Sequence, residues 1–183
     1  HNVSSAASDV YKRQVYKFRE INIPGNGLDG VVDALNYLTA SNKVNFGDNV
    51  PSFTDGTLNA AGKRVVVIGG GDTAMDCVRT AIRQGAKSVK CMYRRDRDNM
   101  PGSQREVKNA EEEGVIFEWL TTPQGFTSDS KNKNVVTLGV DDGPVKGVIG
   151  RKMRLGAPDA TGRRVPEEIQ NSDYNEPADL VIK

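Results

Sequence analysis

A run of four β-branched apolar residues, followed directly by three glycines, constrains the fold more than any other stretch. Residues 65–68 read Val-Val-Val-Ile, and Gly69, Gly70 and Gly71 come next. A continuous apolar run is typical of a parallel strand that is buried on both faces, and the glycines end it. Gly69, Gly71 and Ala74 then match the G-x-G-x-x-A pattern of a turn that binds the pyrophosphate of a dinucleotide.

Each small residue in this pattern has a physical role. Gly69 permits the tight turn, Gly71 lets the backbone approach a phosphate because it has no Cβ, and Ala74 lets the following helix pack against the strand. A helix that begins at Asp72 or Thr73 directs its unpaired N–H groups at that phosphate. We therefore predict that the pyrophosphate is bound by a glycine turn, which consists of Gly69, Gly70, Gly71, Asp72 and Thr73.

The sequence after the glycine turn predicts a helix and a second strand. Apolar residues recur at the spacing of one helical face, at Ala74, Cys77, Val78, Ala81 and Ile82. Gly85 is expected to end this helix, and residues 88–93 to form a strand with Cys91 and Tyr93 on one face. A βαβ unit without a ligand is the alternative. We favour the dinucleotide site because the turn, the helix and the second strand all fit the pattern.

Arginines follow the second strand, at Arg94, Arg95 and Arg97 around Asp96. An NAD site usually carries an acidic residue here, about 20 residues beyond the glycines, to bind the ribose hydroxyls. A guanidinium group instead matches a phosphate. We therefore favour NADP, with Arg94 and Arg95 on its 2′-phosphate and Arg97 or Arg105 as candidate helpers. The alternatives are a solvated charged loop, and Asp96 as the acid of an NAD site displaced by two positions.

A further helix is predicted after the arginines. Residues 103–106 read Ser-Gln-Arg-Glu and match the S-x-x-E capping box, in which Ser103 caps the helix and Glu106 reaches back to it. Val107 and Ala110 form a narrow apolar face, and Gly114 is expected to end the helix.

The remaining segments predict one short helix, a long loop and a series of strands. The helix is expected at 31–39 and the loop at 41–62. A third strand is expected at 115–121, and the pattern changes after Pro123-Gln124-Gly125. Strands around Phe126 and at 135–140, 145–155 and 163–169 then predict an antiparallel meander, before residues 178–183 rejoin the parallel sheet.

Composition excludes several classes of function. The chain of 183 residues has a net charge of +1 and so no general attraction to nucleic acid or membrane. Its only histidine is His1, and its two cysteines have no second ligand at metal-binding spacing, so we expect neither an internal catalytic histidine nor a metal site. Cys77 and Cys91 are expected to serve packing. No apolar run approaches a membrane span of about 20 residues, and we expect a cytoplasmic protein.

The stretch from Val65 to Phe126, which contains GGGDTAMDCVRTAIRQGAKSVKCMYRRDRDNMPGSQREVKNAEEEGVIFEWL, resembles the NADPH-binding domain of glutamate synthase small (β) subunits. Dihydropyrimidine dehydrogenase has a similar domain, and the resemblance extends more loosely from Val15 to Lys183. It implies that the domain is inserted within an FAD-binding domain and that NADPH passes hydride to FAD. Electrons then leave through iron–sulfur clusters to the glutamate synthase large subunit.

The resemblance also implies that this chain is a fragment of a parent protein whose other parts hold the FAD and the clusters. Residues 1–14 look foreign to the family and are expected to be disordered. Residues 15–62 are expected to be a linker or partial FAD-domain segment, and 63–183 the NADPH-binding domain. Related flavoproteins such as adrenodoxin reductase place a glutamate at the spacing of Glu106 near the cofactor, so a cap and a cofactor contact are alternative roles for it.

The expected fold is therefore a three-layer α/β, Rossmann-like dinucleotide-binding domain, with a parallel sheet, helices and an antiparallel β-meander. The expected function is NADPH binding for hydride transfer to FAD in glutamate synthesis. No side chain needs to act as an acid or base, because hydride transfer is cofactor chemistry. The alternatives are a non-catalytic NADP(H)-sensing module, the NADPH domain of another FAD and iron–sulfur reductase, and an independent enzyme with its own small substrate.

Overall fold

The computed structural model describes residues 21–129 and 143–183. The predicted disordered tail at 1–14 and the predicted strand at 135–140 lie outside the described residues.

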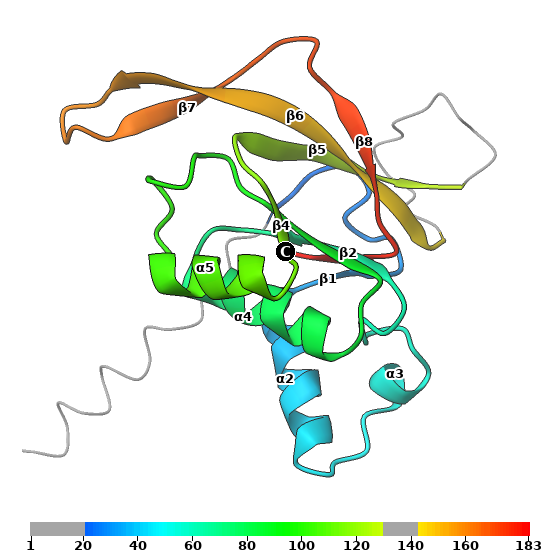
Figure 1. The fold of residues 1–183 in the computed structure, drawn as a ribbon. Helices are drawn as coiled ribbons and strands as arrows, with labels where there is room; N and C mark the ends of the chain where they lie inside the picture. Colours follow the sequence, from blue (N-terminus) through cyan, green and yellow to red (C-terminus); the bar gives the residue numbers. More distant parts are fainter. Residues whose placement is uncertain (1–20, 130–142) are drawn as a thin grey trace, which may run out of the picture.

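Parallel strands form the central sheet of the molecule (Figure 1). In spatial order they are β1 (Val31–Val32), β9 (Leu180–Ile182), β2 (Arg64–Ile68), β3 (Ser88–Met92) and β4 (Ile116–Glu118). The strand predicted before the glycine turn and the strand predicted after the following helix are both confirmed, as β2 and β3. The last predicted strand also rejoins the parallel sheet, where Val181 pairs with Val31 on one side and Val66 on the other.

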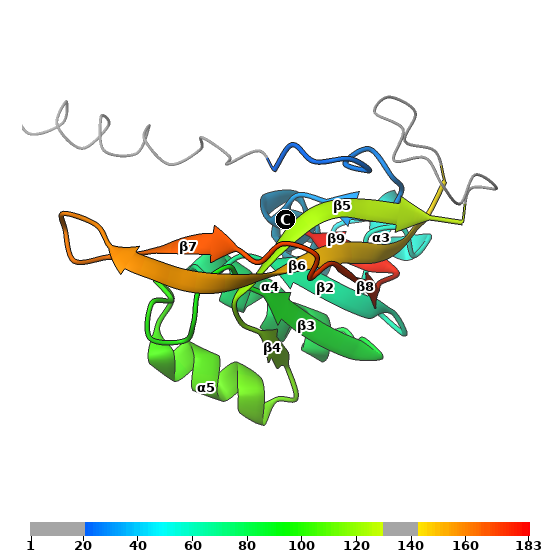
Figure 2. The ribbon, with the colours of Figure 1, turned by 90° about the horizontal axis from the view of Figure 1, so that it is seen from above.

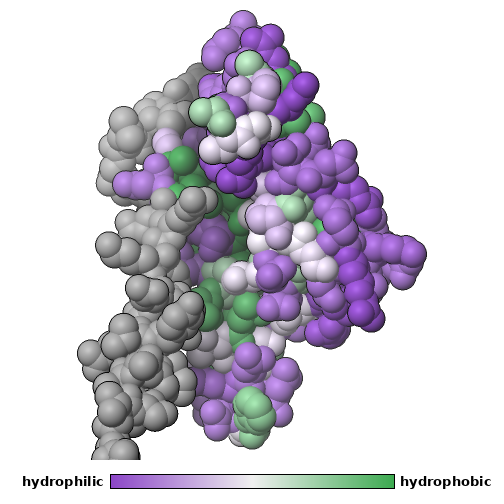
Figure 3. All heavy atoms as spheres, turned by 90° about the vertical axis from the view of Figure 1, so that its left-hand side faces the viewer, coloured by the Kyte–Doolittle hydropathy of each residue, from purple (hydrophilic) through white to green (hydrophobic). Residues whose placement is uncertain are grey.

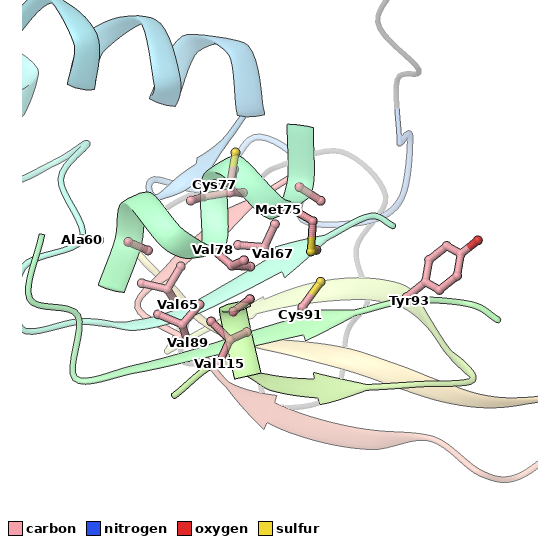
Figure 4. Close-up of a cluster of buried hydrophobic side chains, with 14 of the residues drawn as sticks. Ala60, Val65, Val67, Met75, Cys77, Val78, Val89, Cys91, Tyr93 and Val115 are labelled. Atoms are coloured by element: carbon pink, nitrogen blue, oxygen red, sulfur yellow. The ribbon is translucent and has the colours of Figure 1, made fainter. Parts of the chain in front are cut away.

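Helices cover one face of this sheet (Figure 1). They are α2 (Ala34–Asn45), α4 (Asp72–Arg83) and α5 (Gln104–Glu112), with the single turn of α3 (Pro51–Thr54) beside them. Val65 and Val67 of β2 and Cys91 of β3 point toward α4 and meet its buried face, which includes Val78 (Figure 4). Because strand side chains alternate between faces, Val66 faces the opposite side, and this explains the unbroken apolar run in the sequence.

An antiparallel sheet covers the other face of the parallel sheet. It contains β5 (Thr121–Ser128), β6 (Val145–Pro158), β7 (Arg164–Glu168) and β8 (Tyr174–Pro177). Phe126, Val145 and Val148 form a second core cluster against Val66 and Val181. Seen from above, β6 and β7 extend past the parallel sheet (Figure 2). The predicted three-layer fold is therefore confirmed.

The predicted boundaries of the first helix are wrong. Val31 and Val32 form the edge strand β1, and the helix begins at Ala34 and ends at Asn45. The two valines pair with β9, because β-branched residues fit a sheet edge better than the first turn of a helix. The predicted loop at 41–62 is accordingly shorter, since it begins inside α2 and contains α3.

Two expectations around the meander are also wrong. The third parallel strand ends at Glu118, and Leu120, with a φ of 51°, turns the chain into β5. Pro123 and Gly125 do not end a strand but lie within β5. The pairing of β5 with β6 shifts register between these two residues, as in a β-bulge. The sequence also missed β8, which pairs with β6 although its residues show no apolar alternation.

The two cysteines are fully buried in the core between α4 and the sheet, as expected for a packing role. Burial raises the pKa of each thiol to about 12, so both remain protonated near neutral pH.

In the part of the chain that the structure describes, no cluster of three or more potential metal ligands occurs. No helix there is both long and apolar enough to span a membrane. One face of the molecule shows a narrow band of hydrophobic side chains beside a mostly hydrophilic surface (Figure 3).

Candidate functional site

The glycine turn joins the carboxyl end of β2 to the first turn of α4. Gly69 has a φ of +149°, a conformation that L side chains rarely adopt, and its N–H donates to the Met92 carbonyl at 3.1 Å. A Cβ at Gly69 would lie 3.2 Å from the Cβ of Ala74. These contacts confirm the predicted tight turn and the close approach of the helix to the strand.

No described atom excludes a side chain at Gly71. Its φ of −95° and ψ of 177° are open to any residue, and a Cβ built on it would meet no described atom within 4 Å. Gly71 occupies the N-cap position of α4, so the unpaired N–H groups of the first helical turn lie beside this open space. A group outside the chain would therefore explain the glycine, and the helix N-terminus favours an anionic group.

Gly70 differs from its neighbours, because it is required by a contact within the protein. A Cβ there would lie 2.3 Å from Cε2 of Tyr93, whose ring fills that space. The carbonyl of Gly70 also accepts a hydrogen bond from the Gly102 N–H at 2.9 Å. The sequence predicted Tyr93 only as a strand residue. In the structure it directly follows β3, and its ring belongs to the buried cluster between α4 and the sheet that also contains Met75 and Cys91 (Figure 4).

Asp72 and Thr73, the other two residues of the glycine turn, are both exposed. Oδ1 of Asp72 accepts a hydrogen bond from the Ser103 N–H at 3.3 Å, which ties the start of α4 to the start of α5. The Thr73 hydroxyl has no hydrogen-bond partner among the described residues.

The two adjacent arginines after β3 lie in different environments. Arg94 is exposed and has no hydrogen-bond or ion-pair partner within the described ranges. Arg95 is only 8% exposed, and its buried Nε has no hydrogen-bond partner there either. The carbonyl of Arg95 accepts the Leu120 N–H at 3.0 Å, which holds this segment to the chain leaving β4. Arg94 is therefore the cation that a ligand can reach directly.

The candidate helpers also differ. Arg97 is bound to α5, because its Nη1 donates to Glu111 at 2.9 Å and its Nε to Gln104 at 3.3 Å. Arg105, in the first turn of α5, is exposed, and its side chain has no partner among the residues described. Of the two, Arg105 is thus the one whose guanidinium is available to a ligand.

The predicted capping box at α5 is half right. Ser103 is the N-cap residue, but its side chain makes no capping hydrogen bond. Glu106 pairs with Arg79 of α4 instead of reaching back, and Arg79 also binds Glu113 at 2.7 Å. The carboxylate that was expected to reach back to Ser103 is thus bound to Arg79. A contact between Glu106 and a cofactor stays a prediction.

Asp96 organises the loop that carries the arginines. Its Oδ1 accepts two hydrogen bonds from Asn99, one from the backbone N–H at 3.0 Å and one from Nδ2 at 2.6 Å. The Tyr93 hydroxyl donates to the Asn99 carbonyl at 3.1 Å. We call residues 94–103 the arginine loop. The hydrogen bonds of Asp96 with Asn99 close a turn in its first half. Near its end, the Gly102 N–H donates to the Gly70 carbonyl of the glycine turn.

The glycine turn and the arginine loop follow β2 and β3, which are parallel neighbours, so both lie at the carboxyl edge of the sheet. The strand order changes direction at β2, which has β3 on one side and β9 on the other. In open α/β sheets this is the place where ligands bind. The arrangement offers free helix N–H groups, an open space at Gly71 and a guanidinium at Arg94 without a partner in residues 21–129 and 143–183. This combination suits an anionic nucleotide.

Comparisons with known proteins show the family of the chain. The family model described as pyridine nucleotide-disulphide oxidoreductase matches residues 17–150. The chain is 64% identical over 168 residues to a putative glutamate synthase [NADPH] small chain of Cereibacter sphaeroides, covering 92% of this chain and 37% of that protein. It is 60% identical over 169 residues to the glutamate synthase [NADPH] small chain of Azospirillum brasilense, covering 92% and 32%.

A solved structure shows the same fold. It is that of an FAD-dependent pyridine nucleotide-disulphide oxidoreductase from Desulfovibrio vulgaris, with a TM-score of 0.51 and 15% identity. The match covers 89% of this chain and 32% of that one. The chain thus spans about a third of the length of these relatives.

Proposed function

The chain belongs to the pyridine nucleotide-disulphide oxidoreductase family, and from this membership we propose that it is the NADPH-binding part of a flavoprotein similar to the glutamate synthase small subunit. The two relatives at 64% and 60% identity support this assignment, since both are named as NADPH-dependent glutamate synthase small chains. The observation that carries the proposal is the open space at Gly71, beside the unpaired N–H groups at the start of α4.

In this proposal the pyrophosphate lies against the glycine turn. The N–H groups at the start of α4 bind it, and the missing side chain of Gly71 leaves the room. Arg94, with no partner among the described residues, binds the 2′-phosphate. Arg105, which is also exposed, is a second cation for the same phosphate. Arg95 is proposed to contribute its charge from a buried position, and Arg97 to remain bound to Glu111.

NADPH supplies the hydride, and the FAD that receives it is proposed to be held by the FAD-binding domain of the parent chain. The residues of this chain bind and orient the dinucleotide, and none is needed as an acid or base. Iron–sulfur clusters in the parent protein and a glutamate synthase large subunit are the proposed route for the electrons. We further propose that residues 63–183 are the NADPH-binding domain, with β1 and α2 of the preceding segment completing its sheet and helical layer.

The test is a calorimetric titration of the chain with NADPH and with NADH at fixed ionic strength. We expect NADPH to bind more tightly, because only NADPH carries the 2′-phosphate. Equal affinities for the two nucleotides would contradict the proposal. Binding of neither would contradict it as well.

A further inference from the structure

One oxygen of the Asp96 carboxylate, Oδ1, accepts hydrogen bonds within the arginine loop. Both of its hydrogen bonds go to Asn99, three residues later, and they close a turn that contains Arg97 and Asp98. A ribose-binding acid at this point of the fold would instead present its carboxylate to the ligand. The hydrogen bonds that Asp96 makes in the structure thus lie within the loop.

The turn that Asp96 closes is also fixed to the glycine turn. The Asn99 carbonyl accepts the Tyr93 hydroxyl at 3.1 Å, and the ring of Tyr93 lies against Gly70. Three residues further on, the Gly102 N–H donates to the Gly70 carbonyl at 2.9 Å. The arginine loop is therefore held to the glycine turn through Tyr93, through Gly102 and through the Ser103 N–H, which donates to Asp72 Oδ1 at 3.3 Å. Asn99 connects the first of these contacts to Asp96.

We propose that Asp96 is a positioning residue for NADPH selectivity, holding the arginine loop at a fixed place beside the glycine turn through Asn99. The proposal rests on the proposed NADPH site. An ordered loop keeps Arg94 near the 2′-phosphate, so less conformational entropy is lost when the nucleotide binds. NADH has no 2′-phosphate, so its affinity does not depend on where the loop holds Arg94.

The charge of Asp96 predicts an effect of the opposite sign. A carboxylate near the 2′-phosphate repels it, so removing the charge alone would strengthen NADPH binding. Asp98 provides the matched control, because it lies in the same loop and is exposed with no hydrogen-bond or ion-pair partner in the described part of the chain. Asp98→Ala removes the same charge and none of the loop's hydrogen bonds.

The experiment compares Asp96→Ala, Asp96→Asn and Asp98→Ala by calorimetric titration with NADPH and with NADH. Asp96→Ala removes the acceptor of both Asn99 bonds, and we expect NADPH affinity to fall roughly tenfold, the scale of one or two lost hydrogen bonds, with NADH affinity unchanged. Asp96→Asn keeps an oxygen acceptor and is expected to retain most of the selectivity. Asp98→Ala is expected to bind NADPH at least as tightly as the unmodified chain.

Each other outcome contradicts the inference in a recognisable way. If Asp96→Ala and Asp98→Ala change NADPH affinity equally, only charge matters at this position. If Asp96→Ala weakens NADH more than NADPH, Asp96 is the ribose-binding acid of an NAD site. A loss of affinity for both nucleotides together with a lower unfolding midpoint indicates a purely structural role. If the unmodified chain shows no preference for NADPH, the proposed function itself fails, and this result is separate from any effect of the variants.

Discussion

The ring of Tyr93 occupies the space in which a side chain at Gly70 would lie, with Cε2 only 2.3 Å from the ideal Cβ position. The ring has little freedom to move away. Its hydroxyl is bonded to Asn99, and its edge meets the Trp119 ring in a T-shaped contact with centroids 6.4 Å apart. The neighbouring glycine, Gly71, has open space at the same place. Gly70 is thus required by a neighbouring side chain, whereas no described atom excludes a side chain at Gly71.

Substitution of these two glycines should separate stability from binding. We expect Gly70→Ala to lower the free energy of unfolding by about 1–3 kcal/mol, because the added methyl group overlaps a buried ring. Gly71→Val should lower the free energy of unfolding by only about 1 kcal/mol, because valine is a poorer N-cap residue than glycine. It should abolish NADPH binding, because its branched side chain fills the proposed pyrophosphate space. Chemical denaturation and calorimetry measure the two effects. Unchanged NADPH affinity in Gly71→Val would remove the proposed site from the glycine turn.

Arg94→Ala should weaken NADPH by roughly 10- to 100-fold and leave NADH unchanged. The range corresponds to one charge-assisted contact of about 1.5–3 kcal/mol, with solvent screening favouring the lower end. Arg95→Ala is the comparison, because Arg95 is largely buried and its loss should also lower stability. Parallel titrations at one ionic strength measure the effect. An equal loss for both nucleotides on Arg94→Ala would show that Arg94 does not recognise the 2′-phosphate.

The pair formed by Arg64 and Asp179 should make stability depend on pH at the acidic end. Hydrogen bonds from Arg64 to the Asp179 carboxylate lower the pKa of that carboxyl to about 2, below its ordinary value near 4. A depressed pKa in the folded state stabilises the fold above the unfolded pKa. This contribution is lost as pH falls from about 4 toward 2. Denaturation curves across this range should show a smaller loss for Asp179→Asn than for the unmodified chain; parallel curves would contradict the assignment.

The chain by itself should be colourless and should not reduce dyes with NADPH. Hydride transfer needs the FAD that we propose is held elsewhere in the parent protein. Absorbance spectra of the purified chain and a steady-state assay with NADPH and a dye measure both properties. A yellow preparation with a flavin spectrum, or sustained dye reduction, would contradict this division of roles.

Much of the fold could be predicted because local patterns and tertiary packing agree. The apolar run at Val65–Val67 and the helical stripe that includes Cys77 and Val78 both form buried faces. Val31 and Val32 were misassigned because their partner strand β9 is about 150 residues away in sequence, and no local pattern reports such a pairing. The strand β8 was missed because its residues show no apolar alternation, and its place is set by its pairing with β6.

At the site, the sequence predicted which segments meet but not which contacts each side chain makes. The glycines and arginines follow neighbouring strands, and that adjacency follows from the βαβ pattern. The partners of Glu106 and Asp96 could not be predicted in this way. Glu106 had a capping role open to it in sequence, and a nearer cation on α4 replaced it. Asp96 had an NAD role open to it, and in the structure its Oδ1 accepts both bonds from Asn99.

The position of β9 between β1 and β2 has a consequence for the order in which the chain can assemble. Val181, with no exposed surface, fills the gap between Val31 and Val66, yet it emerges from the ribosome long after both. Until it arrives, β1 has no partner in the parallel sheet and β2 has one free edge. Unpaired strand edges can form hydrogen bonds with strands of other chains. Strand pairs that are distant in sequence also form slowly. The interior position between β1 and β2 is filled last. Their free edges therefore stay open to pairing with other chains until residues 180–182 have been synthesised.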